Sequence, residues 1–169
     1  MKRQLTLAFT LCTIFLAGTL VIAHPHFNKT VIVKLPGGAE ATIVYNTTPA
    51  NEANAAKQAV GAFVTPRQPK LKLSADLKVG DVTIPAGEYI IGCIKNSETD
   101  WTMALYSGSL ARGAQPDMTK VIKLDSMFST SAGLAPHMLI DISPGTGKFE
   151  GKAVLTLHFG SLFLAGALS

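Results

Sequence analysis

The stretch LKVGDVTIPAGEYIIGCIK at residues 77–95 decides the fold class of this chain. Two apolar, β-branched runs, 78–84 and 88–95, are separated by Pro85-Ala86-Gly87, a combination typical of a turn. The second run has hardly any polar position between Tyr89 and Ile94, which indicates a strand that is buried on both faces. These residues therefore predict a β protein whose central strand lies inside the sheet.

Side chains of a strand point alternately to its two faces. We therefore predict that both faces of this strand are largely covered, because neither of them is polar. One face is predicted to hold Tyr89, Ile91 and Cys93, and the other Ile90, Gly92 and Ile94. Cys93 is interpreted as an inert core thiol, because free cysteine is among the residue types most often buried. Tyr89 and Trp101 are interpreted as packing residues rather than a ligand platform.

Short strand patterns continue on both sides of this stretch. Pro36-Gly37-Gly38 predicts a hairpin between the first two runs, and the alternation at 40–46 places Ala41, Ile43 and Tyr45 on one face. The only predicted helix covers residues 51–60, with Asn51 as its N-cap and Gly61 at its end. The other predicted strands are 30–35, 40–46, 70–76, 101–106, 120–124, 137–143, 152–159 and 162–168. This pattern predicts a mostly β fold, an antiparallel β-sandwich of about 8–10 short strands with one short helix.

The apolar last run, 162–168, has two interpretations. It is too short to cross a bilayer. It is therefore either a last strand buried in the sandwich or an exposed edge that pairs with a partner.

The N-terminal 23 residues have the three parts of a cleavable signal peptide. Lys2 and Arg3 form a positive start, 5–22 is an apolar run, and Val21-Ile22-Ala23 offers short side chains for the peptidase. A membrane anchor is the alternative, but no stop-transfer charges follow the run. We therefore expect cleavage after Ala23, a single domain over residues 24–169, no membrane span after cleavage, and a secreted or periplasmic product.

The charge pattern bears on whether the protein binds nucleic acid. The net charge is +4, the basic residues are scattered and no basic run appears. This pattern does not favour nucleic-acid binding. The expected partners are an envelope component or a small ligand, of unknown identity.

The segment from Leu77 to Tyr89, followed by Asp100-Trp101-Thr102, resembles a bacterial secreted family. It is similar to the domain-of-unknown-function family 2911, which carries a Gly-x-x-x-x-Ala-Gly-x-Tyr hairpin followed by an acidic residue with Trp-Thr. The resemblance covers roughly residues 30–168. It implies export and a β-sandwich, and it brings no catalytic residues.

The sequence contains no motif that is specific for a catalytic activity. There is no Gly-x-Ser-x-Gly elbow, no Gly-rich phosphate loop and no Cys-x-x-Cys, and the acidic residues are dispersed. Two functions remain open. The first is an exported, non-catalytic binding or structural module of the bacterial cell envelope, without a cofactor. The alternative is a copper-binding protein.

Four histidines, His24, His26, His137 and His158, form the candidate metal site. Cleavage after Ala23 would make His24 the N-terminus, so that its α-amine and its imidazole could both bind one copper ion. A peptide-only site needs backbone amides, which Pro25 cannot supply.

The two C-terminal histidines are predicted to meet across a hairpin of 137–143 and 152–159. A register that pairs Ser143 with Lys152 would set His137 directly across from His158, on the face away from the core. The competing interpretation is a mobile terminus and two solvent-facing histidines.

Overall fold

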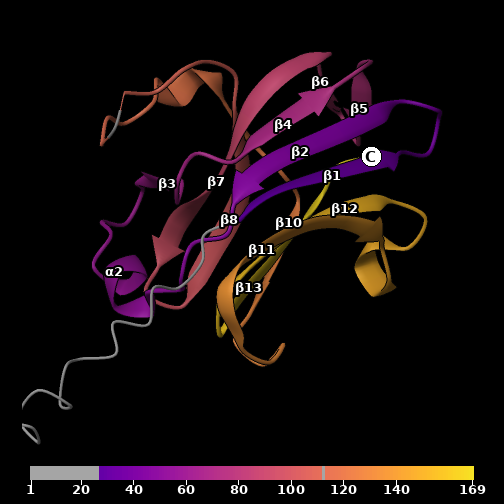
Figure 1. Ribbon diagram of the computed structural model, residues 1–169. Helices are drawn as coiled ribbons and strands as arrows, with labels where there is room; N and C mark the ends of the chain where they lie inside the picture. Colours follow the sequence, from indigo (N-terminus) through magenta and orange to yellow (C-terminus); the bar gives the residue numbers. More distant parts are fainter. Residues whose placement is uncertain (1–26, 112) are drawn as a thin grey trace, which may run out of the picture.

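Two antiparallel β-sheets packed face to face form the fold (Figure 1). The computed structural model describes residues 27–111 and 113–169. In that part the larger sheet has the order β1-β2-β4-β7-β8-β9, with β3 paired to β7, and the smaller sheet has the order β10-β13-β12-β11. A separate hairpin of β5 and β6 covers one end.

The strand bounds follow the chain in order. They are β1 Asn28–Lys34, β2 Glu40–Asn46, β3 Phe63–Val64, β4 Lys70–Leu73, β5 Leu77–Val79, β6 Val82–Ile84, β7 Gly87–Ser97, β8 Asp100–Tyr106, β9 Val121–Lys123, β10 Ser126–Ser129, β11 Ala135–Pro144, β12 Ala153–Gly160 and β13 Leu162–Ala167. Two 3-10 turns lie at Met118–Lys120 and Gly147–Phe149.

The predicted fold class is confirmed: the chain is mostly β, antiparallel, with one short α-helix. The structure has more strands than predicted, because the sequence pattern did not identify the shortest ones. β3 has 2 residues and β10 has 4, which is too short for an alternating pattern to stand out. The run 78–84 is two strands, because Gly80 adopts a positive φ of 60° and turns the chain.

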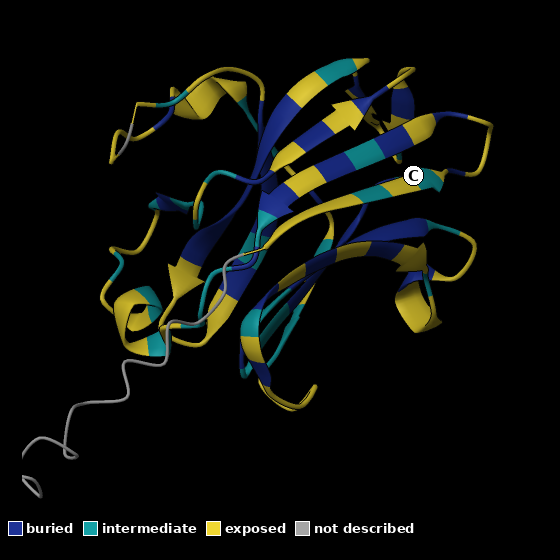
Figure 2. Cartoon of the chain, viewed as in Figure 1, coloured by how far each residue is buried: buried dark blue, intermediate teal, exposed yellow. Residues whose placement is uncertain are grey.

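Strand β7 lies in the middle of the larger sheet, and both of its faces are covered as predicted. Tyr89, Ile91 and Cys93 belong to the core between the sheets. Ile90 and Ile94 belong to a second cluster on the outer face, where Phe63 of β3 and Leu110 pack against them. Figure 2 shows the buried positions running along the strands that face each other across the sandwich.

The first hairpin also follows the prediction. β1 pairs with β2, and Lys34 lies opposite Glu40. Ala41, Ile43 and Tyr45 are buried, so the alternation at 40–46 correctly identified the core face.

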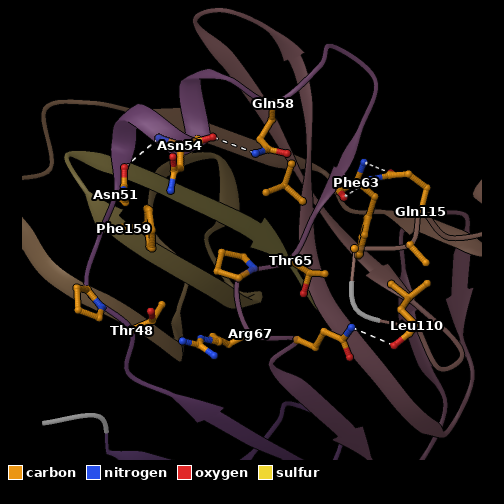
Figure 3. Close-up of a pocket in the computed structure, with 17 residues that line it drawn as sticks. Thr48, Asn51, Asn54, Gln58, Phe63, Thr65, Arg67, Leu110, Gln115 and Phe159 are labelled. Atoms are coloured by element: carbon orange, nitrogen blue, oxygen red, sulfur yellow. Dashed lines mark hydrogen bonds between the residues drawn. The ribbon is translucent and has the colours of Figure 1, made fainter.

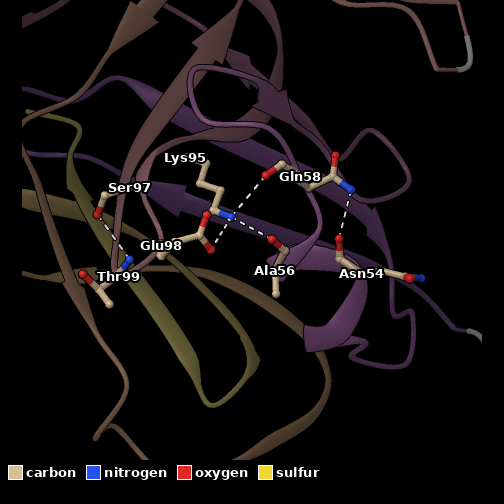
Figure 4. Close-up of polar contacts among 7 residues, drawn as sticks. All are labelled: Asn54, Ala56, Gln58, Lys95, Ser97, Glu98 and Thr99. Carbon is tan, nitrogen blue, oxygen red and sulfur yellow. Dashed lines mark hydrogen bonds and ion pairs between the residues drawn. The ribbon is translucent and has the colours of Figure 1, made fainter.

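The helix, α2 (Glu52–Ala56), is shorter than the predicted 51–60. Asn51 is its N-cap as predicted, and its Oδ1 accepts a hydrogen bond from Asn54 N–H at 3.0 Å. The C-terminal end differs because the buried ammonium of Lys95 donates to the carbonyls of Ala56 at 2.7 Å and Gln58 at 3.1 Å (Figure 4). These carbonyls therefore bond to a neighbouring strand instead of continuing the helical ladder.

The apolar C-terminal run is a core strand. β13 lies between β10 and β12, so both of its edges are paired, and Leu164 and Leu168 are buried in the core between the sheets. Gly166 lets β13 lie against Met103 of β8, because a Cβ there would come within 2.8 Å of that side chain. The alternative of an exposed pairing edge is therefore wrong.

Within residues 27–111 and 113–169, none of the helices is long and apolar enough to cross a membrane.

Candidate functional site

A cleft of about 720 Å³ lies where α2, β3, Leu110 and residues 113–115 meet (Figure 3). Its polar lining is dominated by carboxamides and hydroxyls, and Arg67 is the only charged side chain among the described lining residues. The carboxamides belong to Asn51, Asn54, Gln58, Gln68 and Gln115.

Two of these carboxamides join different walls of the cleft, and a third bonds within the helical segment. Gln115 accepts a hydrogen bond from Phe63 N–H at 3.1 Å, which fixes the segment 113–115 against β3. The carboxamide of Gln68 donates to the carbonyl of Leu110 at 3.1 Å, and that of Gln58 donates to the carbonyl of Asn54 at 3.0 Å. Specific hydrogen bonds between its walls therefore maintain the shape of the cleft.

Three other polar side chains remain available to a ligand. The guanidinium of Arg67, the carboxamide of Asn54 and the hydroxyl of Thr48 make no hydrogen bond or ion pair with any residue in the described part of the chain. Figure 3 shows Asn54 on one side of the half-buried Phe159, and Thr48 and Arg67 on the other. This group offers donors, acceptors and one positive charge around an aromatic ring.

The backbone that presents Arg67 is strained. Arg67 and Gln68 have positive φ angles of 59° and 48°, a region that costs a non-glycine residue about 1–2 kcal/mol. The turn is held by the Thr65 hydroxyl, which donates to the carbonyl of Ile91 at 2.8 Å, and by the Gln68 bond to Leu110. Strain of this kind persists where surrounding contacts over-determine it, and it clusters at binding sites.

A small apolar slot adjoins the cleft and reaches between the two sheets. It has a volume of about 40 Å³ and shares Ala55, Val64, Pro66 and Phe159 with the cleft. Its other walls are formed by buried or half-buried side chains: Cys93, Trp101, Phe128, Leu157, Leu162 and Leu164. No polar group of the described chain lines it.

The cleft was not predicted from the sequence. Its residues come from segment 48–68, from positions 110 and 113–115, and from position 159, which are far apart in the chain. The one local sign was Pro66 and Pro69 on either side of Arg67 and Gln68, a pattern typical of a turn.

The predicted pairing of His137 with His158 is wrong by two residues. Ser143 lies opposite Val154 rather than Lys152, and His158 lies opposite Leu139. Two features move the register. The loop closes through Gly145 N–H and the Lys152 carbonyl at 2.8 Å with Phe149 buried, and β11 is irregular between Ala135 and Leu139.

Each of these two histidines has other neighbours. His137 forms an isolated bridge with Pro49. His158 packs edge-on against Phe163, with ring centroids 5.5 Å apart, and its Nε2 lies 3.4 Å from the carbonyl of Gly133. His24 and His26 lie outside the described residues. Within the described residues, no group of three or more His, Cys, Asp or Glu side chains is placed to hold a metal ion.

The buried cysteine and aromatic residues lie where the sequence predicted. Desolvation by burial raises the pKa of the Cys93 thiol to about 12, so this thiol stays protonated and unreactive. Tyr89 and Trp101 are buried, and the Tyr89 hydroxyl donates to the carbonyl of Pro85 at 2.6 Å.

The fold and the cleft define a class: an antiparallel β-sandwich with a polar cavity beside its only α-helix in the described chain. Comparison with protein-family models, with curated proteins and with solved structures finds no match.

Proposed function

We propose that this protein is an exported, non-catalytic binding module whose cleft holds a small polar ligand of neutral or negative charge. The observation that supports it is the set of uncommitted polar groups, Arg67, Asn54 and Thr48, around Phe159 in a cavity of about 720 Å³. Cavities that bind small molecules have volumes of about 300–1,000 Å³ and few, well-placed polar groups.

The chemistry of the lining favours binding over catalysis. The described lining residues include no Asp, Glu, His, Cys, Lys or Tyr, so they supply hydrogen bonds and one positive charge but no group suited to proton transfer near neutral pH. Export is part of the proposal, and it rests on residues 1–23 and on the resemblance to family 2911.

The proposal is tested by screening neutral sugars, sugar acids and short peptides against the purified protein. Backbone NMR shifts would locate any binding. Asn54→Ala should keep the fold, because alanine is the best helix former, and should weaken a hit about tenfold, roughly one hydrogen bond of 1.4 kcal/mol.

Lys57→Ala is the matched control, because Lys57 is exposed at the end of the same helix and does not line the cleft. Binding that perturbs residues elsewhere, or that is equally strong in Asn54→Ala, would contradict the proposal.

One specific contact favours a second candidate, copper binding. Phe27, which directly follows His24-Pro25-His26, exchanges backbone and hydroxyl hydrogen bonds with Thr47 at 2.8 and 3.0 Å. The next residue, Thr48, accepts from Met138 N–H at 2.8 Å. The described chain therefore begins close to His137 in β11, and imidazole and amine nitrogens suit Cu(II).

Intact mass and metal analysis of exported protein test this second candidate. The expected product begins at His24 and retains copper after removal of free metal. The double variant His137→Ala with His158→Ala should lose affinity for Cu(II). An N-terminus other than His24, or an unchanged affinity in the double variant, would rule it out.

A further inference from the structure

The charge of the cleft selects for an anionic group. Arg67 is the only charged side chain among the described lining residues, and no carboxylate in the described chain pairs with it. An arginine guanidinium is planar and binds a carboxylate through two parallel hydrogen bonds. Arg67 belongs to a turn with two consecutive positive φ angles, and backbone strain of this kind clusters at binding sites.

The two other uncommitted side chains of the cleft match an amide. The Asn54 carboxamide has both a donor and an acceptor, and the Thr48 hydroxyl can act as either. A peptide group has the same complement, one N–H and one C=O. The side chains on the two sides of Phe159 can therefore bind a carboxylate and a neighbouring amide of one ligand (Figure 3).

The apolar slot limits the size of the ligand group that can enter it. Its 40 Å³ is slightly more than the roughly 30 Å³ that one water occupies in the liquid. A cavity that admits benzene is about 150 Å³, so this slot takes a methyl or similar small group and excludes an aromatic ring. A sugar acid has no apolar group to place there, and a long acyl chain would not fit.

We infer that the ligand is the C-terminal end of a short peptide, with a free carboxylate on Arg67, its last amide at Asn54 and Thr48, and a small aliphatic last side chain in the slot. This inference rests on the proposed binding function and names its ligand class. A di- or tripeptide has the size of the drug-like molecules that cavities of this volume bury.

Titration with N-acetyl-Ala-Ala, followed by NMR shifts and calorimetry, tests the inference. The free acid should bind, and its C-terminal amide should bind at least tenfold more weakly because it lacks the charge. N-acetyl-Ala-Phe should also bind more weakly, because its ring exceeds the slot. Glucuronic acid is the comparison for an acid without an apolar group.

Two variants remove the cation in different ways. Arg67→Gly should weaken binding of the free acid at least tenfold while leaving the thermal midpoint unchanged or higher, because glycine adopts φ 59° without strain. Arg67→Asn should weaken binding equally, since asparagine tolerates the left-handed region. Lys57→Ala removes the same charge outside the cleft and should bind like the unmodified protein.

Equal binding of acid and amide, a preference for the phenylalanine peptide, or unchanged affinity in Arg67→Gly would overturn the inference. If sugars or glucuronic acid bind the cleft and the free acid does not, the inference fails and the proposed binding function stands. If none of these molecules shifts the resonances of cleft residues, both fail.

Discussion

Lys95 shows what a single buried residue contributes to this molecule. Its side chain is 1% exposed, and its ammonium donates to the carbonyls of Ala56 and Gln58 and to Glu98. Glu98 is 75% exposed, so the ion pair itself is worth little. The contribution of Lys95 lies in satisfying the carbonyls that end α2.

We predict that Lys95→Met destabilises the protein by about 1–3 kcal/mol, because it leaves these carbonyls without their donor. The measurement is urea unfolding followed by circular dichroism. Lys57→Met, an exposed lysine at the same helix end, should stay within about 0.5 kcal/mol of the original protein. Equal stability of Lys95→Met would show that water replaces the ammonium at no cost.

At the scale of elements, α2 connects the two sheets. Its C-terminal end is held by Lys95 of β7 in the larger sheet. At its first turn, the Glu52 carboxylate accepts 2.7 Å hydrogen bonds from the N–H and the hydroxyl of Ser161, between β12 and β13 of the smaller sheet. A helix of five residues is not stable alone, so these two attachments place it and the cleft wall it forms.

The attachment at Glu52 predicts a pH dependence. Hydrogen bonds donated by the hydroxyl and the backbone N–H of Ser161 lower the pKa of the Glu52 carboxyl below its ordinary value of 4.5. A lowered folded-state pKa contributes stability that is present above the ordinary value and is lost as the pH falls through the folded value. Glu52→Gln should therefore be less stable than the unmodified protein at pH 7, and the difference should shrink below pH 4.5.

The control is a double-mutant cycle with Ser161→Ala, which removes the hydroxyl donor. In that background the effect of Glu52→Gln at pH 7 should be smaller. A stability difference that is the same at pH 7 and pH 3 would contradict the predicted role of the carboxylate.

Strand β3 depends on a glycine of its neighbour. A Cβ at Gly92 would overlap the ring of Phe63 and come within 2.8 Å of the Val64 carbonyl. We predict that Gly92→Ala costs about 1–3 kcal/mol, as overpacking does, and displaces β3, which lines the cleft. The measurements are thermal unfolding and NMR shifts of residues 63–68.

A second substitution makes this prediction specific. Phe63→Leu removes the ring that Gly92→Ala would meet, so the double variant should recover part of the lost stability. If Gly92→Ala is as stable as the unmodified protein, β3 is not held by this close approach.

At the scale of the whole molecule, the core between the sheets is one continuous cluster. Ile91 of β7 is fully buried in it, together with Met138 of β11 and Leu155 of β12. We predict that Ile91→Asp abolishes soluble expression, because an unpaired carboxylate cannot be buried between the sheets. Soluble yield and circular dichroism measure the effect. Thr83→Asp introduces the same charge at an exposed position of β6 and should express normally.

Alternation of residue types allowed much of the fold to be predicted. A buried strand at 88–95, the core face at 41, 43 and 45, and the N-cap at Asn51 follow from local patterns, because the two-residue period of a strand and the side-chain cap of a helix depend on neighbours in the sequence. The burial of Cys93 was predicted in the same way, and the apolar C-terminal run indicated a buried strand as one of two interpretations.

Contacts between distant segments determine the features that the sequence pattern did not predict. The register of His158 depends on how the loop after β11 closes over Phe149, and the end of α2 depends on an ammonium from β7, about 40 residues along the chain. The cleft is lined by Thr48, Asn54, Arg67 and Phe159, and it forms only after both sheets have packed. By itself the sequence determined an antiparallel β protein with a central buried strand, because that pattern is local. The cleft depends on the tertiary structure, because its geometry is set by pairing and packing across long sequence separations.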